Sequence, residues 1–561
     1  MGHRRSTLVV LFAVALGLIA WRATRRPERI LYVGGPVLTM DATNRVAEAL
    51  LTEGDRIVAV GRAADLRRLA DGGARTVALD GRAVLPGFID AHSHFPGAGL
   101  TAVFADLASP PVGRVSTIPE LQARLEAQAT HVGADKWVIG VGYDDTLLRE
   151  QRHPTRADLD RVSARQPVGI VHVSAHLAVV NTLGLERLGI TRATTDPPGG
   201  RIQRDPATGE PTGVLEESAA HGIIDRLRHP SLLDALKMVR HANQRYLAAG
   251  VTMAQNGYAG TRDMRSLSQV SQLGVVSMRL VFWPEADAAD SMPADTLWLR
   301  HGAVKLIGDG SIQGYTAYLS QPYFKPPTDD RDYRGYPRWP REALTEQVVR
   351  WQRGGRQIAV HGNGDAAIDD ILDAFEAAQR AAPRADTRHV IVHAQMARHD
   401  QLDRMQRLGV IPSFFVLHTY YWGDRHREIF LGPERAAHIS PTRSALERGI
   451  RFTLHADTPV APMEPLRIVW AAVNRRTTSG IALGPTERIT PMQALRAVTI
   501  DAAYQHFAER DTGSLEVGKL ADLVIVERSP LADPEHIDQI RVLETIVGGR
   551  TAYRNDAARG A

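Results

Sequence analysis

The segment AVLPGFIDAHSHF, residues 83–95, ends an apolar run with two histidines one residue apart. On a β-strand the side chains alternate between faces, so His92 and His94 would point the same way, about 7 Å apart along the backbone. Two imidazoles at that spacing can close on one metal ion. They could equally be two polar residues where a strand meets a loop, so the rest of the chain has to decide.

Three further metal-competent side chains follow short apolar segments. His361 ends QIAVH, His393 ends VIVH, and Asp457 follows FTLHA. Any one of these could be a hydrogen-bonded structural residue, but five such side chains at the ends of four predicted strands favour a divalent-metal centre. Nitrogen and oxygen donors of this kind suit zinc and neighbouring divalent ions. His455 beside Asp457 fits a supporting role near the metal and a structural role equally well.

Lys305 lies in the middle of an apolar segment, VKLI. An ammonium group in a dry strand is costly, and burial lowers the lysine pKa and favours the neutral amine. One interpretation is a lysine whose ammonium reaches the rim of the fold. The other is that neutral Lys305 takes up CO2 and becomes a carbamate, an anionic oxygen ligand that bridges two ions. Composition and spacing do not decide between them.

The elements that must position these side chains form a repeating pattern. From about residue 85, short apolar strands alternate with helical stretches, which predicts βα units and parallel strands. The predicted strands cover residues 85–92, 250–256, 278–283, 302–308, 356–361, 389–394, 409–415 and 450–456. Eight strands favour an α/β fold of the distorted (β/α)8, TIM-like barrel type over an open sheet. Active sites of such barrels lie at the carboxyl ends of the strands.

Both ends of the chain carry a second pattern. Residues 29–85 and 511–556 contain short strands with Gly and Asp-Gly turns, which predicts one small composite β-sandwich. The barrel then occupies residues 86–510. Its first two strands are too far apart for one connection, and the gap holds a predicted helix at 117–129. We therefore expect an inserted subdomain at about 100–215.

The N-terminus has an apolar stretch from Thr7 to Trp21 with arginines on both sides. As a helix it would be about 22 Å long, short of the roughly 30 Å hydrocarbon core of a bilayer. This length fits a signal peptide better than a full span, but no clean cleavage site follows it, so a short uncleaved anchor is the competing interpretation. From residues 1–26 we expect an exported or membrane-anchored protein of the periplasm or cell envelope.

Charge and cysteine content exclude several classes of protein. The formal net charge is +4, and five arginines within the first 26 residues account for it, so the body of the chain has no basic excess. With no basic stripe, we expect no nucleic-acid binding. The chain contains no cysteine, which excludes disulfides, iron–sulfur clusters and thiol nucleophiles. We expect a small-molecule substrate, and the oligomeric state is left open.

A series of longer motifs runs through nearly all of the chain after residue 30. In order they are LPGFIDAHSH, GYDDTLL, PTRADLD, GEPTGVL, VKLIGDGSIQG, AVHGNGDAAID, VHAQ, HADTPV and GSLEVGKLADLVIV. Together they resemble the amidohydrolase superfamily, and within it the amidohydrolase-3 group of N-substituted formamide deformylases and YtcJ-like hydrolases. The resemblance implies a distorted barrel, a composite β-sandwich and a divalent-metal centre.

The resemblance also implies roles for the residues singled out above. One ion would be held by His92, His94 and Asp457, the other by His361 and His393, with carbamylated Lys305 between them. One or two zinc ions are expected, and Asp457 would be the catalytic proton acceptor. No ligand position of the family is lost in this chain.

Candidate substrate contacts come from the predicted insertion. Tyr143 and Asp144, followed by Asp145, end a strand there, and His176 lies in VSAHLAVVN. These side chains could face the substrate, and the first three could equally cap a turn.

The function predicted is hydrolysis of a non-peptide carbon–nitrogen bond by a metal-activated water. A second possibility keeps the site and changes the bond to that of an ester, a carbamate or an N-acyl amino acid. A third, from another class, is a membrane-tethered binding protein on a barrel without activity.

Overall fold

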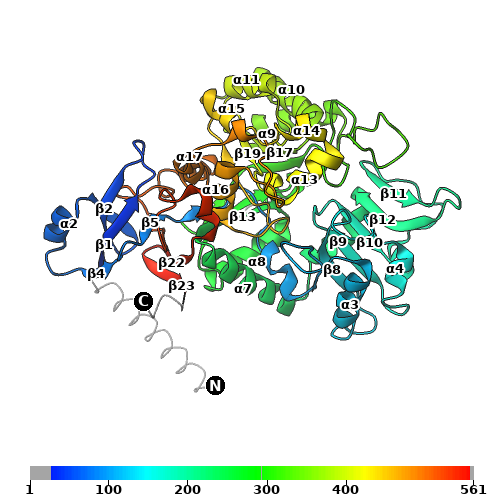
Figure 1. The fold of residues 1–561 in the computed structure, drawn as a ribbon, viewed down its shortest axis with the longest axis horizontal. Coiled ribbons are helices and arrows are strands. Elements are labelled where there is room, and N and C mark those ends of the chain that lie inside the picture. The colour runs from blue at the N-terminus through cyan, green and yellow to red at the C-terminus, as the bar shows by residue number, and fades with distance from the viewer. Residues whose placement is uncertain (1–26, 292–293, 556–561) are drawn as a thin grey trace, which may run out of the picture.

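A computed structural model describes residues 27–291 and 294–555 of the chain. Three parts are visible in Figure 1: a β unit at one end, a barrel with its helices in the middle, and a second sheet at the other end. The two termini of the described chain meet in the first part, so the barrel and the second sheet are formed by the middle of the sequence.

The β unit at one end combines both ends of the chain. Its eight-stranded sheet has the order β23-β22-β21-β5-β1-β2-β3, with β4 beside β1. The strands are β1 (Arg29–Leu38), β2 (Val46–Glu53), β3 (Arg56–Gly61), β4 (Arg75–Ala78), β5 (Ala83–Pro86), β21 (Leu523–Val526), β22 (Val542–Val547) and β23 (Arg550–Arg554). Side chains from both chain ends, including Tyr32, Leu50 and Leu523, share one core. Helix α2 (Ala63–Ala70) packs on β1 and β2.

The barrel consists of two parallel arcs of strands. One arc has the order β15-β14-β13-β6 and the other β16-β17-β18-β19-β20. The strands are β6 (Phe88–Ile89), β13 (Val251–Ala259), β14 (Arg279–Pro284), β15 (Leu299–His301), β16 (Val304–Ile307), β17 (Ile358–Gly362), β18 (Val390–His393), β19 (Ile411–Phe414) and β20 (Thr453–Leu454). Each of the eight predicted segments overlaps one of these strands, and β15 is an additional short one.

Single contacts join the two arcs. A parallel bridge between Glu285 and Lys305 links β14 to β16. At the other seam the Asp457 amide donates to the His92 carbonyl at 3.1 Å, and the His94 amide donates to the Thr458 carbonyl at 2.8 Å. The barrel is therefore distorted at the seam where three of the predicted ligands lie, in agreement with the predicted fold class.

Helices surround the barrel between its strands. They include α6 (His221–Arg228), α7 (Leu232–Ala248), α8 (Thr261–Gln272), α9 (Arg341–Arg353), α10 (Asp365–Ala381), α11 (His399–Leu408), α15 (Thr442–Glu447), α16 (Pro465–Asn474), α17 (Pro491–Ala497) and α18 (Ile500–Gln505). In α10 the apolar side chains of Ile368, Ile371, Leu372 and Phe375 are buried. Residues spaced in this way form one stripe of a helix, which here packs toward the strands.

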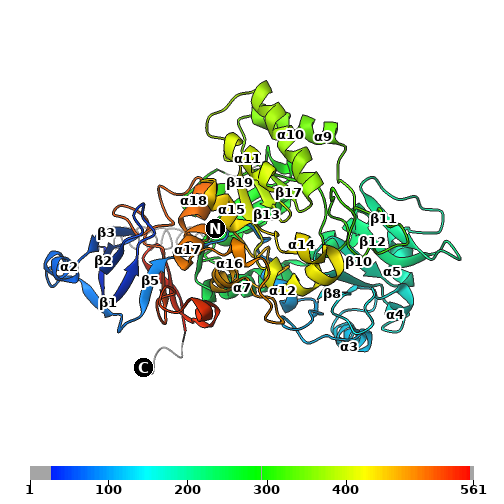
Figure 2. The ribbon, with the colours of Figure 1, turned by 45° about the horizontal axis from the view of Figure 1, so that its top comes forward.

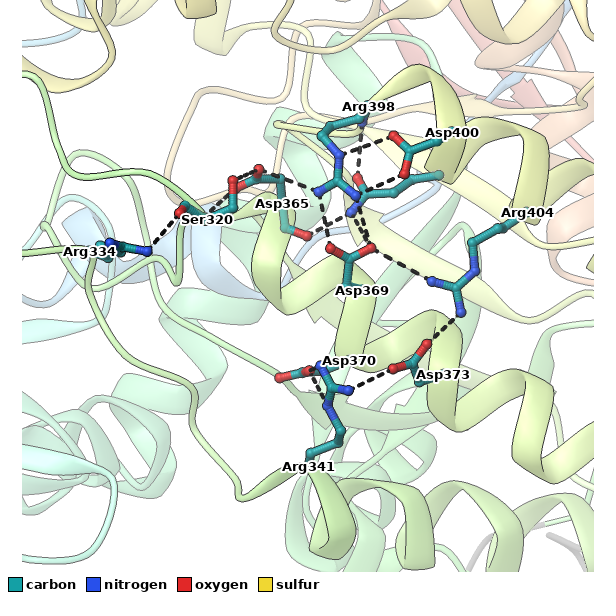
Figure 3. A network of polar contacts seen from close by, with 11 residues as sticks. Ser320, Arg334, Arg341, Asp365, Asp369, Asp370, Asp373, Arg398, Asp400 and Arg404 are labelled. Carbon is teal, nitrogen blue, oxygen red and sulfur yellow. Dashed lines mark hydrogen bonds and ion pairs between the residues drawn. The ribbon is translucent and has the colours of Figure 1, made fainter.

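The outer face of α10 carries a network of ion pairs (Figure 3). Arg398 pairs with Asp369 at 3.1 Å and Asp400 at 2.9 Å, and Arg341 of α9 pairs with Asp370 at 2.6 Å. At the start of α10, Asp365 accepts a hydrogen bond of 2.8 Å from the Ser320 amide. The network therefore connects α9, α10, α11 and the loop after β16, so it fixes the segments that follow Lys305 and His361.

A six-stranded sheet is inserted between β6 and β13, at the opposite end of the molecule from the β unit (Figure 2). Its order is β11-β12-β10-β9-β8-β7. The strands are β7 (Ala105–Asp106), β8 (Val138–Tyr143), β9 (Val168–His172), β10 (Leu177–Val180), β11 (Gly200–Arg204) and β12 (Pro211–Glu217). The predicted helix here is α3 (Ile118–Ala129), whose Leu121 and Leu125 enter a separate core with strand residues. The insertion is therefore a folded unit with its own core.

The predicted signal or anchor segment, residues 1–26, lies outside the described residues. Among the residues that the structure does describe, no helix has both the length and the apolar character needed to cross a bilayer.

Candidate metal centre and active site

The predicted ligands come together at the carboxyl ends of the barrel strands. They arrive from five places: His92 and His94 from the loop after β6, Lys305 from β16, His361 from β17, His393 from the end of β18, and Asp457 from the loop after β20. Parallel strands place their carboxyl ends at one mouth of a barrel, which explains how residues 365 positions apart in sequence meet.

The tightest group is formed by His92, His94 and Asp457. Asp457 Oδ1 lies 3.3 Å from His94 Nε2 and 3.5 Å from His92 Nε2. One ligand atom of each residue lies within 4.8 Å of the others. Asp457 Oδ1 is buried and has no hydrogen-bond partner among the described residues. A buried polar atom without a partner needs an explanation, and a cation among these nitrogen and oxygen donors supplies one.

The second group contains His361, His393 and Lys305. The rings of His361 and His393 have centroids 4.5 Å apart, and Lys305 Nζ lies 3.3 Å from Nε2 of His92. Burial lowers the pKa of Lys305 from 10.5 to about 7, so the amine is largely neutral above neutral pH. Its nitrogen therefore lies between the two groups in the form that can react with CO2.

Burial keeps the imidazoles of His92 and His393 neutral, and neighbouring groups keep the Asp457 carboxylate charged. Burial lowers the pKa values of His92 and His393 well below the usual value for histidine. Burial alone would raise the pKa of Asp457, but the neighbouring His94 and His92 hold that pKa well below its usual range. Neutral imidazole and ionised carboxylate are the forms that bind metal ions.

Outer residues turn the imidazoles toward the centre. His92 Nδ1 lies 2.9 Å from Gln255 Oε1, and His361 Nδ1 lies 3.1 Å from Asp309 Oδ1. Each amide or carboxylate oxygen accepts the Nδ1 proton and leaves the Nε2 lone pair for a metal. Neither Gln255 nor Asp309 was predicted from the sequence. Gln255 could have been noticed as a polar residue inside the apolar strand β13, and Asp309 as an aspartate four residues after Lys305.

Two residues of the centre have strained backbones. His393 and Asp457 have φ values of +73° and +53°, in a region that non-glycine residues rarely adopt. Each such residue costs on the order of 1–3 kcal/mol and persists only where the surrounding structure enforces it. The conformations aim these two side chains into the centre before any ligand binds.

Comparison with known proteins identifies the family of the chain. The model of the amidohydrolase family (Amidohydro_3) matches residues 75–553. The chain belongs to the amidohydrolase family. It is 30% identical over 548 residues to an N-substituted formamide deformylase of Arthrobacter pascens, covering 93% of this chain and 98% of that one. It is 26% identical to the putative amidohydrolase YtcJ of Bacillus subtilis, covering 94% and 99%.

A solved structure extends this likeness to the fold. An uncharacterised metal-dependent hydrolase of Pyrococcus furiosus superimposes with a TM-score of 0.69 at 26% identity, covering 90% of this chain and all of the other. The family and this structure together make the chain a metal-dependent hydrolase that acts on carbon–nitrogen bonds.

The structure does not bring Tyr143 and Asp144 of this amidohydrolase into the metal centre. Asp144 accepts hydrogen bonds from Trp422 Nε1 at 3.0 Å and the Thr146 amide at 3.0 Å, and it pairs with Arg425 at 3.3 Å. The carboxylate therefore ties the insertion to the segment after β19. Tyr143 bonds to a neighbouring histidine through its hydroxyl at 3.1 Å. A substrate contact for either residue stays a prediction.

A second group of candidate ligands lies beside them in the insertion. Asp144, Asp145 and His172 have ligand atoms within 4.8 Å of one another. However, the Ser174 amide donates to His172 Nδ1 at 3.2 Å, which places the imidazole proton on Nε2. His172 Nε2 faces Asp145 Oδ1 at 3.1 Å. An Nε2–H that faces a carboxylate offers no lone pair to a metal ion, whereas the Nδ1 contacts of His92 and His361 leave their Nε2 lone pairs free.

His176 is the one predicted substrate contact that reaches the centre. Its ring centroid lies 5.2 Å from that of His361, and its Nδ1 lies 3.0 Å from Oε2 of Glu217. Burial alone would lower the pKa of His176, but the Glu217 carboxylate raises it above the usual value. Glu217 was not singled out from the sequence, because the motif GEPTGVL ends before it.

A cavity of about 350 Å³ reaches Thr458, the residue after Asp457, although none of the six predicted ligands lines it. It lies between the loop after β6, the insertion strands β8 and β9, and the segment 458–467. Thr458, the neighbour of Asp457, forms part of its wall, and Leu100, Val141, Val171 and Met463 make much of the wall apolar. The volume is in the range of small-molecule sites, and its position would suit the part of a substrate that does not react.

Proposed function

We propose that the amidohydrolase binds two divalent metal ions and that these ions are zinc. The ligands of one are His92, His94 and Asp457, those of the other are His361 and His393, and a carbamate on Lys305 lies between them. The observation that carries this proposal is the group of two imidazoles around the unpartnered, buried Asp457 Oδ1. The carbamate is supported by the buried amine of Lys305, 3.3 Å from His92 Nε2.

Different residues of the protein would then transfer the proton and orient the imidazoles during hydrolysis. When bound, the ions would supply a water of lowered pKa and polarise the substrate carbonyl. Asp457 would accept the proton of that water on a carboxylate oxygen and pass it to the departing nitrogen. Gln255, Asp309 and His455 would hold the imidazoles in the orientation that this arrangement requires.

The substrate class that we propose is a non-peptide amide, with N-substituted formamides first. The support is the 30% identity to an N-substituted formamide deformylase along nearly the whole of both chains. The mainly apolar cavity next to Asp457 would accommodate a hydrophobic N-substituent. Because loops on this fold set the substrate, the runner-up keeps the metal centre and replaces the substrate by an ester, a carbamate or an N-acyl amino acid.

A non-catalytic binding protein fits less well. Such a protein would need none of the backbone strain at His393 and Asp457, nor the hydrogen bonds that orient the Nε2 atoms.

We also propose that residues 1–26 direct the protein to the membrane or across it. The support is the sequence alone: an apolar stretch between arginine clusters, too short for a comfortable span.

The test of the proposed activity is a substrate screen with zinc-loaded, full-length protein. N-substituted formamides, N-acyl amino acids, cyclic amides, carbamates and esters are compared by amine or alcohol release, with Asp457→Asn as the inactive control. We expect a formamide to give the highest kcat/KM. A preference for esters, with no amide turned over, would contradict the proposed bond class.

A further inference from the structure

The insertion contributes a histidine–carboxylate pair to the edge of the metal centre. His176 directly precedes β10, and Glu217 is the last residue of β12, its neighbour in the sheet. The Glu217 amide donates to the His176 carbonyl at 2.7 Å, and Glu217 Oε2 lies 3.0 Å from His176 Nδ1. Backbone and side chain together therefore fix the imidazole in one orientation.

The position of Glu217 is costly, which argues against an incidental contact. Its backbone has φ +51° and ψ −119°, an unusual conformation for a residue other than glycine. Its side chain is buried, and besides His176 the Thr316 hydroxyl and Arg338 interact with the carboxylate. A Cβ on Gly310 would lie 2.3 Å from Oε1, so the glycine leaves the space that the carboxylate fills. Strain of this kind gathers at functional sites.

Hydrogen bonding also selects the tautomer of His176. The carboxylate can only accept, so the proton lies on Nδ1 and the Nε2 lone pair is free. Arg338 Nη1 lies 3.9 Å from Glu217 Oε2 and offsets part of the carboxylate charge. Because the Glu217 carboxylate still raises the pKa of His176, the free Nε2 lone pair belongs to the neutral form of the ring, which alkaline pH favours. With Nδ1 engaged, Nε2 is the ring nitrogen left for another contact, and the ring centroid lies 5.2 Å from that of His361.

We propose that His176 Nε2 accepts a hydrogen bond from the N–H of the scissile amide, and that Glu217 is the positioning residue for this contact. The inference rests on the proposed amide hydrolysis and narrows its substrate class. Amides with one N-substituent carry the required N–H, whereas N,N-disubstituted amides and esters lack it. The insertion would thus favour amides that carry an N–H over N,N-disubstituted amides and esters, which the metal ligands alone would not distinguish.

The experiment uses matched substrates that differ in this one N–H. The first is the N-monosubstituted amide turned over fastest in the screen, and the second is its N-methyl derivative. Values of kcat/KM are measured for both substrates at the same pH of 9, well above the ordinary pKa of histidine, because alkaline pH favours the neutral imidazole. Comparing ratios between variants cancels the intrinsic reactivity of each substrate.

The variants distinguish the loss of the hydrogen bond between His176 and the substrate from a general disturbance of the fold. His176→Leu should lower kcat/KM for the N–H amide by about 10- to 100-fold, the scale of one lost hydrogen bond to a positioned group, and change the N-methyl amide by less than about threefold. His176→Gln, which offers an oxygen near the Nε2 position, should recover part of the loss. Glu217→Ala should reproduce much of the effect, while Glu217→Gln, which still accepts from Nδ1, should stay within about threefold of wild type.

The matched control is Glu216→Gln. Glu216 is also buried on β12, but its carboxylate accepts from Gln203 at 2.8 Å and Tyr336 at 3.2 Å, away from His176. This variant should keep both kcat/KM values, and all variants should keep the metal content of the wild type. Equal losses for the two substrates in His176→Leu, or no loss, would overturn the role of His176 and leave amide hydrolysis intact. Turnover of no amide by the wild type would overturn both.

Discussion

Asp457 is the residue proposed both to bind a metal ion and to transfer the proton. We expect Asp457→Asn to lower kcat by about 10²–10⁴, the scale for loss of a positioned acid–base group, because an amide cannot accept the proton. Metal content should fall less than in a His92→Ala, His94→Ala double variant, since the two imidazoles near Oδ1 remain. Steady-state kinetics with elemental analysis checks this. Turnover within tenfold of wild type would move the proton transfer to another residue.

The lowered pKa of Lys305 predicts that reactivation of the metal-free protein depends on pH. A pKa of about 7 leaves roughly nine-tenths of metal-free chains with a neutral amine at pH 8 and roughly one-tenth at pH 6. Because only the neutral amine adds to CO2, reactivation of metal-free protein by zinc and bicarbonate should be several-fold faster at pH 8 than at pH 6. The initial rate of recovery is measured at a fixed concentration of dissolved CO2.

The matched variants are Lys305→Ala and Lys305→Arg. Both should be inactive, and small carboxylates should partly rescue the alanine variant by taking the place of the carbamate. An arginine variant with near-normal activity would rule out the carbamate, because a guanidinium cannot form one at this position or bind a cation.

Single residues also show what sequence could and could not predict. That His92, His94 and Asp457 lie together could be predicted, because polar residues at the ends of apolar strands leave a signal in the sequence itself. Gln255 and Asp309 could not, since a polar residue beside a strand acquires its role only when the fold brings a histidine to it. The sequence also could not show that Asp144 contacts Trp422 and Arg425 from a distant segment, and its substrate contact stays a prediction.

Among the elements, the end of β13 tests how closely the barrel supports its ligands. A Cβ on Gly257 would lie 2.4 Å from Cε1 and 2.6 Å from Nδ1 of His92. Gly257→Ala should therefore push the His92 ring aside, remove metal from this group and lower activity by at least about tenfold, since displacements near 1 Å are costly at active sites.

The matched control is Gly133→Ala on the insertion surface, where the nearest atom would lie 3.6 Å away. Elemental analysis and kcat/KM are measured for both variants. Full metal content in Gly257→Ala would show that the His92 loop is free to adjust.

The elements of the barrel were predictable because βα alternation is local, whereas their ends were not. The predicted segment 85–92 contributes to two sheets: Leu85 and Pro86 end β5 of the composite sheet, and only Phe88 and Ile89 join the barrel. Gly87 between them packs against Thr252, where a Cβ would come within 2.2 Å. Such a change of sheet depends on contacts with residues far away in the sequence.

For the molecule as a whole, the N-terminal segment is the part separable from the chemistry. Deleting residues 1–26 should move the protein from the membrane fraction to the soluble fraction and leave kcat and KM unchanged, because the predicted ligands all lie beyond residue 90. Fractionation of the native host with kinetics of both forms checks this. Full-length protein found mainly in the cytosol would contradict export.

At this scale the sequence predicted the fold class well, because the motifs span the whole chain in order. The position of the insertion relative to the active site could not be predicted from the sequence. Its sheet places His176 and Glu217 beside His361 through contacts between segments far apart in the chain, which no local sequence pattern indicates.

Metal stoichiometry, measured by elemental mass spectrometry, shows whether His92 and His94 hold a metal ion. Wild-type protein is compared with the His92→Ala, His94→Ala double variant after the same purification. We predict one to two divalent ions per wild-type chain, zinc foremost, and the loss of at least one in the double variant. Equal metal content in the two proteins would contradict the assignment of these histidines as ligands.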